Sequence, residues 1–394
     1  MMYTMLQRDR AIRGLELEIT RRYKNYGAAG FADAEERSEL SRKIAEESGG
    51  RNLLEWLKDS STTPIYMPSI YVRFGAQPSP IAAAKVGAVH SAFVCNNVNV
   101  KDLCIGKYQG YLHTASDGKK YLLSLRGMDP SVSQTLSTFS AAARNANAGD
   151  AGAQHHICTN AEYAFLALLC KAQGYQPRGN NYYGKDVAEQ TETGDVAYSY
   201  LESSNNTRYI GRVLTGSGPL PWSHDGSPYG VWDLNGNVWE FTDGLQLSDG
   251  KILIIKDNDA ASSNASINAV YKSVLPDGTL GATDAATALK FVAAAADYGI
   301  LLGGSGAQFK TAGQTYGTAS AAAPALLKEL CIIPHDAGDY GSDGLWYNLS
   351  GARCALRGGR WTDGSNAGVF ALYLLYALAS TGDTVGARPA FLRS

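Results

Sequence analysis

Charge of one sign is not in excess in this sequence. Its 394 residues carry 35 Lys and Arg against 37 Asp and Glu, a formal net charge of -2 at pH 7. Nucleic acids and anionic membranes attract proteins with a basic excess, so neither is an expected partner. Long hydrophobic runs are missing too: the longest, about 369–379, is shorter than the ~20 residues that a membrane-spanning helix needs. Insertion into a membrane is therefore not expected.

Cysteine is scarce and scattered. The six cysteines stand nine or more positions apart and make no Cys-x-x-Cys pair, which argues against a zinc cluster or a thioredoxin-type site. Buried free thiols are the simplest interpretation, and disulfides are the alternative. A Gly-x-Ser-x-Gly elbow and a Walker loop are also missing. The N-terminus reaches charge at Arg8 before an apolar stretch forms, so we expect no export signal.

Hydrophobic residues and tyrosine, by contrast, are abundant. A chain of 394 residues that is 45% hydrophobic can bury a substantial core in one large domain or two smaller ones. The 23 tyrosines suit a recognition surface, because a large amphipathic ring gives contact area at little entropic cost. Core packing could use many of these tyrosines, so their number alone decides nothing.

Residues 1–60 form a charged segment with apolar residues at helical spacing. We expect one helix that carries Ile12 and Ile19, a break at Gly27, a second helix over about 32–47 and a short third helix over about 53–57. Two interpretations of this segment are open. It could be a small helical bundle packed on the main domain, or a stalk that oligomerises the chain or docks it to a partner.

From Thr63 the sequence changes to short strands and Gly-rich turns, beginning with an alternating strand over 65–74. A helix follows from Thr159, which is expected to form a capping box with Glu162. This helix is apolar on most of its faces, which predicts burial against a sheet. Residues of about 246–345 are rich in Ala, Gly, Ser and Asp and weakly periodic. We interpret them as insertions and long loops.

The last forty residues combine two kinds of position. A frame of Gly, Trp, Phe and Arg alternates with residues that share no chemistry. Such a pattern is expected of a fixed scaffold that carries an interchangeable binding surface. Gly358 and Gly359 allow the backbone to turn before Trp361 enters the core.

Three segments, in chain order, resemble one protein family. They are the capped helix followed by Arg178–Gly184, the motif Gly-Val-Trp-Asp-Leu-Asn-Gly-Asn-Val-Trp-Glu-Phe at 230–241, and Leu356–Trp361 with the closing Gly386-Ala387-Arg388. Together they look like the formylglycine-generating-enzyme branch of the C-type lectin fold. The resemblance implies an α+β protein with a C-type lectin, formylglycine-generating-enzyme-like domain at 63–394, long loop insertions, and a small N-terminal helical region at 1–60.

The C-terminal frame resembles, more narrowly, the variable proteins of diversity-generating retroelements. In that family a template rich in Asn codons rewrites the segment from the Arg-Gly-Gly-x-Trp motif to the final Gly-x-Arg, here about 357–391. The frame positions that the resemblance implies are Arg357, Gly358, Gly359, Trp361, Gly368, Val369, Phe370, Leu372, Leu374, Gly386 and Arg388. The rewritten, ligand-contacting positions that it implies are Arg360, Thr362, Asp363, Ser365, Asn366, Tyr373, Leu375, Tyr376, Leu378, Ser380, Thr381, Asp383 and Thr384.

Alternation within this segment gives a physical prediction. Tyr373 falls between two leucines that suit the core and should point outward. Tyr373, Leu375 and Tyr376 would then form an exposed apolar and aromatic cluster, which on a folded protein marks an interaction site. The alternative is that 372–378 is one buried helix or strand. Tyr373, Tyr376 and Arg360 are the residues expected to dominate affinity.

Catalysis is not expected. The oxidase that names the branch binds copper through a pair of cysteines after its Arg-Gly-Gly motif, and residues 360–394 contain no cysteine. Related iron-dependent sulfoxide synthases need a His triad, whereas His155 and His156 are adjacent and the other histidines are dispersed. We expect this pair to mark the entry to a helix. A sulfatase-modifying-type metalloenzyme and a purely structural virion component are the alternatives.

The resemblance also implies a structural metal. In the oxidase, the loop that matches 235–240 binds calcium through a side-chain amide, two main-chain carbonyls and a carboxylate. Asn235, the carbonyls of Gly236 and Val238, and Glu240 preserve these oxygens, although calcium takes six to eight. The alternative is that Asn237 and Glu240 only hydrogen-bond the loop to the Arg-Gly-Gly segment. No other cofactor is required.

These observations predict a non-catalytic, receptor-recognition protein whose ligand is a macromolecule, either a cell-surface protein or a glycan. The family resemblance implies that the chain is encoded by a phage or prophage and placed on a virion or a bacterial surface. A cytoplasmic place is the alternative. A homo-oligomer formed through the N-terminal helices is a further expectation.

Overall fold

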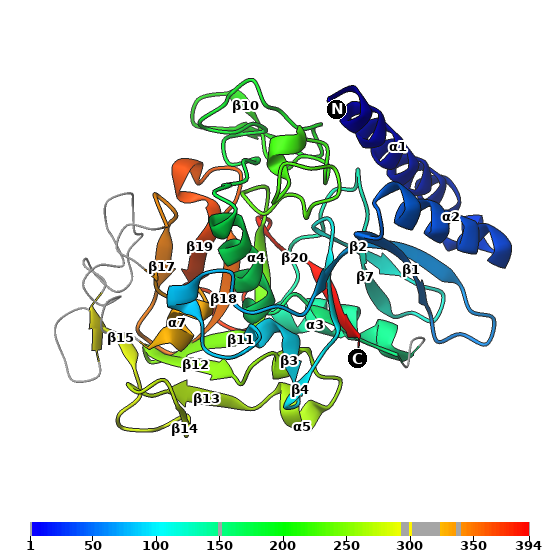
Figure 1. The fold of residues 1–394 in the computed structure, drawn as a ribbon. Coiled ribbons are helices and arrows are strands. Elements are labelled where there is room, and N and C mark those ends of the chain that lie inside the picture. Colours follow the sequence, from blue (N-terminus) through cyan, green and yellow to red (C-terminus); the bar gives the residue numbers. More distant parts are fainter. Residues whose placement is uncertain (1, 149–151, 293–298, 302–323, 336–339, 394) are drawn as a thin grey trace.

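A mixture of helices and sheets makes up the chain (Figure 1). The computed structural model describes residues 2–148, 152–292, 299–301, 324–335 and 340–393. Two sheets carry the fold, one of five strands next to the N-terminal helices and one of ten strands that holds most of the C-terminal half. Within the described ranges, no helix has the length and apolarity to cross a bilayer.

The N-terminal segment begins with α1 (Met2–Tyr26) and α2 (Ala34–Glu47), which are joined by a short 3-10 turn. Both predicted helices are confirmed, and Gly27 breaks the first with a positive φ of 57°. The third predicted helix is wrong, because 52–58 forms the strand β1 (Asn52–Lys58). The hydrophobic pattern of so short a run is compatible with a helix or a strand. It forms a strand because it pairs with β2 (Tyr66–Gly75) over its whole length.

The five-stranded sheet has the order β1-β2-β5-β21-β8. β2 confirms the strand expected at 65–74, but most of its residues are buried instead of alternating, because both faces of the sheet are covered. The bounds of the other three strands are β5 (Asp102–Gly106), β8 (Ala153–Ile157) and β21 (Pro389–Arg393). The chain therefore ends inside the sheet that its first strand begins.

Helix α1 packs on this sheet. Ile12 and Ile19 share a buried cluster with Met67 and Ile70 of β2. Glu16 of α1 is also buried and accepts hydrogen bonds from the Lys107 ammonium (2.6 Å) and the Tyr108 hydroxyl (2.6 Å). This packing favours the interpretation of the segment as a bundle on the main domain over that of a free stalk. β1, which lies in the predicted N-terminal region, pairs with β2 of the predicted main domain.

The larger sheet runs in the order β14-β13-β12-β11-β18-β19-β17. Helix α4 (Asn160–Ala172) packs against β11 and β19, and the capping box of Thr159 with Glu162 is present as predicted. Ten of its residues are buried, which fits the predicted burial against a sheet. The strands that matter for the site are β11 (Trp239–Ser248), β17 (Leu345–Tyr347), β18 (Ala352–Gly358), β19 (Gly368–Leu374) and β20 (Val385–Ala387).

The segment of 246–345 is only partly the loop that its composition predicts. It supplies short strands that extend the sheet outward from β11, and it also holds α5 and α7. Strand pairing gives these weakly periodic residues their structure. The expected Gly-rich and Ala-rich loops near 303–307 and 315–323 lie outside the described residues. The elements are β12 (Lys251–Ile255), α5 (Ala265–Asn268), β13 (Tyr271–Val274), β14 (Leu280–Gly281), β15 (Lys290–Val292), β16 (Gly299–Leu301) and α7 (Ala325–Glu329).

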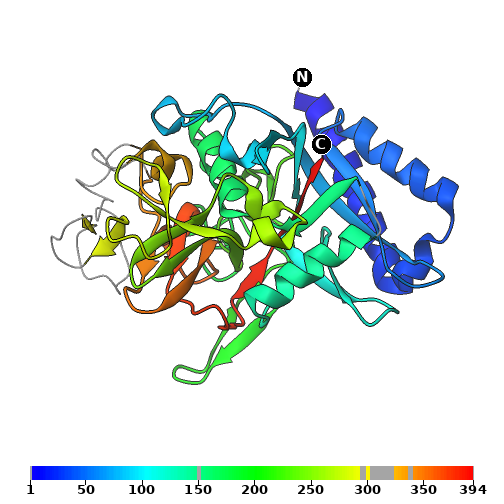
Figure 2. The same ribbon diagram turned by 90° about the horizontal axis from the view of Figure 1, so that it is seen from below.

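Smaller elements lie between these strands along the chain. The β9–β10 hairpin forms a two-stranded sheet of its own, and it projects from the body in both views (Figures 1 and 2). These elements are β3 (Val94–Cys95), β4 (Val98–Asn99), β6 (Gly110–Thr114), β7 (Lys120–Ser124), α3 (Leu136–Arg144), β9 (Ser199–Glu202) and β10 (Thr207–Ile210).

Candidate ligand-binding site

The predicted frame and the predicted rewritten positions differ in burial. All eleven frame positions are buried, whereas twelve of the thirteen rewritten positions are exposed or partly exposed. The exception is Thr384, which is 8% exposed. Its place among freely exposed positions is therefore corrected: its backbone carbonyl accepts a bond from Trp239 N (2.9 Å) beside β20, and this holds the residue against the sheet.

Two buried arginines fix the ends of the segment. The Arg357 guanidinium donates to the Asn160 side chain of α4 (2.7 and 3.0 Å) and to main-chain carbonyls at 330 and 331. Arg388 donates to both carboxylate oxygens of Glu240 (2.7 and 2.9 Å). A guanidinium that is fully bonded in this way is costly to replace. These contacts give a physical reason for both arginines of the frame.

The two glycines of the Arg-Gly-Gly motif have φ of 94° and 90°, a region that other residues rarely adopt. Space excludes larger residues as well. A Cβ on Gly358 would lie 2.9 Å from the Tyr163 hydroxyl, and one on Gly359 would overlap Ala367. The predicted turn before the buried Trp361 is therefore confirmed.

Strand β19 sorts its side chains between two faces of the sheet. Leu372 and Leu374 enter the core beneath α4, while Tyr373 packs on the opposite face with Trp239 and Trp346. Tyr373 thus alternates away from the two leucines as predicted, but it is half-buried and not freely exposed. The alternative of one buried element over 372–378 is wrong, because β19 ends at Leu374 and the residues after it are exposed or partly exposed.

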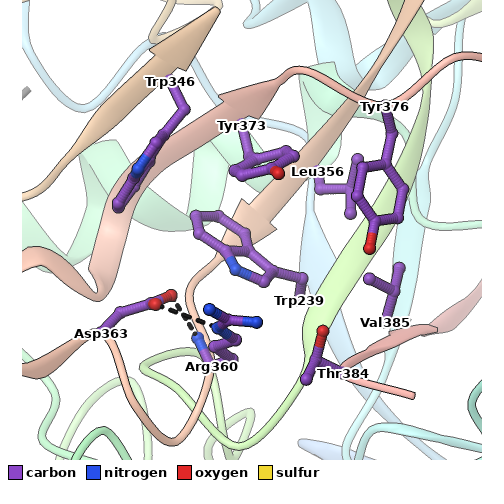
Figure 3. A pocket seen from close by; sticks show the side chains of 9 residues that line it. All are labelled: Trp239, Trp346, Leu356, Arg360, Asp363, Tyr373, Tyr376, Thr384 and Val385. Atoms are coloured by element: carbon purple, nitrogen blue, oxygen red, sulfur yellow. Dashed lines mark hydrogen bonds and ion pairs between the residues drawn. The ribbon is translucent and has the colours of Figure 1, made fainter. Parts of the chain in front are cut away.

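A small pocket opens on this face of the sheet (Figure 3). It has a volume of about 70 Å³, which suits a small group and not a whole ligand. Trp239 lies at its centre, with the rings of Tyr373 and Trp346 at 5.3 Å from it. The remaining residues that line the pocket are Leu356, Arg360, Asp363, Tyr376, Thr384 and Val385.

The polar side of the pocket is the pair of Arg360 and Asp363. Asp363 accepts hydrogen bonds from the Arg360 backbone N–H (2.9 Å) and from its guanidinium (3.2 Å). Burial raises the pKa of the Asp363 carboxyl, and the charge of Arg360 opposes that shift. Burial also raises the pKa of Tyr373 and of Tyr376, so both phenols stay neutral and can donate a hydrogen bond at neutral pH.

The structure brings only some of the predicted positions together. Arg360, Asp363, Tyr373, Tyr376 and Thr384 line the pocket. A neighbouring hollow adds Thr362 and Asp383 and shares Arg360 and Thr384 with the pocket.

The other predicted positions lie apart from these seven. Ser365 lines a different hollow, and Asn366 follows it in the short turn Gly364–Asn366. Four positions lie on the connection between β19 and β20: Leu375, Leu378, Ser380 and Thr381.

Sequence reasoning missed four aromatic residues of this region. Trp239 and Trp346 line the pocket, and Tyr198 and Tyr200 line the neighbouring hollow. Trp239 lies in the 230–241 motif, where a tryptophan is most simply interpreted as a core residue. The motif therefore does not predict that it lines a pocket. The pattern Tyr-Ser-Tyr at 198–200 is a signal for an aromatic strand face that could have been found.

The predicted calcium loop does not fit a calcium ion. The side-chain nitrogen of Gln109 lies among the expected ligands, 3.3 Å from the Gly236 carbonyl, 3.0 Å from that of Val238 and 3.1 Å from Glu240 Oε1. Calcium needs six to eight oxygens at 2.3–2.6 Å, whereas here an amide donor fills the centre. Asn235 points elsewhere, donating to the Pro177 carbonyl (2.9 Å).

The alternative interpretation, in which Asn237 and Glu240 hydrogen-bond the loop to the Arg-Gly-Gly segment, is correct only in part. The Glu240 carboxylate bonds to Arg388, and only the backbone of Glu240 lies opposite Arg357 in the β11–β18 pair. Asn237 bonds to Gln109 and to Val213. The loop does reach the segment through its backbone, because Gly236 N donates to the Gly358 carbonyl (3.0 Å).

The adjacent histidines and the cysteines have structural surroundings in the fold. His155 and His156 lie on strand β8 and not at a helix entry; the ring of His155 packs on Phe391 and His156 bonds to Glu162 (2.7 Å). All six cysteines are buried and free, as the simplest interpretation predicted. Among the described residues, no three His, Cys, Asp or Glu side chains group as metal ligands.

No protein-family model matches the chain, and no curated protein does. Among solved structures, the chain is similar to the Major Tropism Determinant U1 variant at 12% identity and a TM-score of 0.30, covering 87% of this chain and 73% of that one. The P3c variant gives 11% and 0.30, over 85% and 67% of the chains. A likeness at this level establishes neither a shared fold nor a shared function.

Proposed function

We propose that this chain is a non-catalytic, receptor-recognition protein that displays a diversified surface on a C-type lectin scaffold of the formylglycine-generating-enzyme type. The surface consists of the exposed members of the thirteen rewritten positions, centred on Arg360, Tyr373 and Tyr376. Its ligand is a macromolecule on a cell surface. The chain is then the product of a diversity-generating retroelement in a phage or prophage and is carried on a virion. Rewriting by the retroelement would produce such a surface.

The single observation that carries this proposal is the separation of the two kinds of position by burial. The family resemblance assigned the frame residues and the rewritten residues position by position. In the structure all eleven frame residues are buried, and of the thirteen rewritten residues Thr384 alone is buried. This separation supports the proposal, because a position that is rewritten must accept side chains of many kinds.

Stability explains why a rewritten surface must be separated in this way. A protein is stable by only about 5–15 kcal/mol, and replacing one buried large residue costs about 2–5 kcal/mol. Exposed substitutions cost about 0.5 kcal/mol or less. A segment can therefore be rewritten at many positions at once only if those positions avoid the core.

The test is the DNA around the gene. We expect a near-copy of the segment that encodes 357–391, beside a reverse transcriptase gene, with its mismatches at adenines of the copy. Mismatches should fall in codons of the twelve exposed positions, while frame codons agree. Because Thr384 is buried, its codon should agree as well. A genome without such a copy, or mismatches spread over frame codons, would overturn the proposal.

A further inference from the structure

A row of partly exposed tyrosines continues the candidate site onto the β9–β10 hairpin. Tyr198 and Tyr200 stack at 6.1 Å with an interplanar angle of 18°. Tyr200 pairs across the hairpin with Tyr209 (5.9 Å), and Tyr209 packs on Tyr183 (4.7 Å). Each of these rings is partly exposed. The hairpin, green in Figure 2, projects away from the body. The four partly exposed rings form a strip that runs from Tyr198 across the hairpin to Tyr183.

The row is joined firmly to the candidate site. Tyr198 packs on the buried Trp361 of the frame (6.5 Å). Arg212 lies 4.6 Å from the centre of the Tyr198 ring, is held by Asp129 (2.7 and 3.0 Å), and donates to the Asp383 carbonyl (3.1 Å). The base of the hairpin is thus fixed against the end of the rewritten segment.

An open hollow of about 290 Å³ lies where the row meets the rewritten segment. Its floor is aromatic, and its polar lip offers a guanidinium, a carboxylate and hydroxyls. The hydroxyl oxygen of Thr362 is buried and finds no hydrogen-bond partner among the described residues, a state that polar atoms in proteins rarely keep without a ligand or solvent. Lining residues are Tyr198, Tyr200, Arg360, Trp361, Thr362, Asp383 and Thr384.

We propose that this strip is a fixed arm of the binding site and that it takes a neutral saccharide chain. The inference rests on the proposed function. The four tyrosines of the row lie outside 357–391, so the rewriting does not reach them. A fixed arm beside a diversified surface must recognise something that different ligands share, and a repeating surface polysaccharide is such a component.

Chemistry favours a saccharide over a peptide or a phosphate polymer. A sugar ring has an apolar C–H face that fits on an aromatic ring and hydroxyls at its edge that fit a mixed polar lip. Peptide anchors need deep, desolvated pockets, whereas this strip is open. Phosphate polymers need a basic cluster, whereas the lip carries both Arg360 and Asp383.

The experiment is binding to an array of neutral bacterial saccharides by wild type and four variants. Wild type should bind at least one saccharide. Tyr198→Ala with Tyr200→Ala should weaken that binding at least tenfold, whereas Tyr198→Phe with Tyr200→Phe should keep it. The matched control is Leu201→Ala, which alters a 54% exposed side chain of the same strand and should leave binding unchanged. Circular dichroism of each variant verifies folding.

Two results would overturn the inference without touching the proposed function. One is a wild type that binds no saccharide of the array. The other is saccharide binding that survives the double alanine change but is lost with Tyr373→Ala and Tyr376→Ala, which would place the ligand on the rewritten surface alone. The DNA comparison tests the proposed function independently of both.

Discussion

At the residue scale, the roles that could be predicted were those enforced by local geometry. Gly358 and Gly359 were identified as turn residues, and their positive φ angles confirm this. Tyr373 was placed outward by alternation alone. Gln109 could not have been predicted, because it reaches the 235–240 loop from more than a hundred residues away, and a single sequence carries no signal for such a contact.

The position of the Gln109 side chain predicts that calcium does not stabilise the protein. The amide nitrogen of Gln109 has two hydrogens to donate and lies 3.0–3.3 Å from four oxygens, the carbonyls of Asp233, Gly236 and Val238 and Glu240 Oε1. We expect the melting temperature of wild type to be the same in millimolar calcium and in EDTA. Gln109→Ala should lower the free energy of unfolding by about 1–3 kcal/mol, since it leaves buried acceptors without a donor.

The control for this prediction is Gln190→Ala, a change of the same kind at an exposed position, which should have almost no effect in urea titration. A melting temperature of wild type that rises with calcium would show that the loop binds the ion and that the amide arrangement is not the native one.

At the element scale, the predictions failed where pairing with a distant strand decides the structure. The 53–57 run was predicted as a helix, but β2 provides a full-length partner and makes it a strand. The strands of 246–345 have little periodicity of their own and exist through the chain of pairs that starts at β11. Elements with a cap or a long period, such as α4 and α1, were predicted correctly because their signals are local.

The buried ion pair between Glu16 and Lys107, which attaches α1 to the sheet, gives a prediction about stability. Glu16→Ala would leave the Lys107 ammonium buried without its charged partner, and breaking a buried pair of this kind costs about 3–5 kcal/mol. Burial already lowers the pKa of Lys107, and Glu16 opposes that shift. We expect a matching loss of unfolding free energy in urea titration.

Glu18→Ala is the matched control, because Glu18 is exposed on the same helix and its loss should cost about 0.5 kcal/mol or less. Equal effects of the two changes would mean that the helix is not anchored, and the stalk interpretation would be favoured again.

At the scale of the whole molecule, the sequence indicated a mixed α and β protein with N-terminal helices, and this is what the chain forms. The pairing of the terminal strands in one sheet and the projecting aromatic hairpin were not foreseen. Both depend on contacts between segments far apart in the chain. Alternation with buried residues is a local pattern, so the partial exposure of most predicted rewritten positions could be expected from the sequence. Their division among separate hollows could not.

The most direct test of the central claim is the stability of two libraries, measured by resistance to a protease under increasing urea. One library randomises the twelve predicted rewritten positions that are exposed or partly exposed, and the other randomises the eleven frame positions. The account predicts that most members of the first library unfold close to wild type, while nearly all members of the second are cleaved without urea, because core substitutions cost several kcal/mol each. Equal loss of stability in both libraries would contradict the claim that an inert scaffold carries an interchangeable surface.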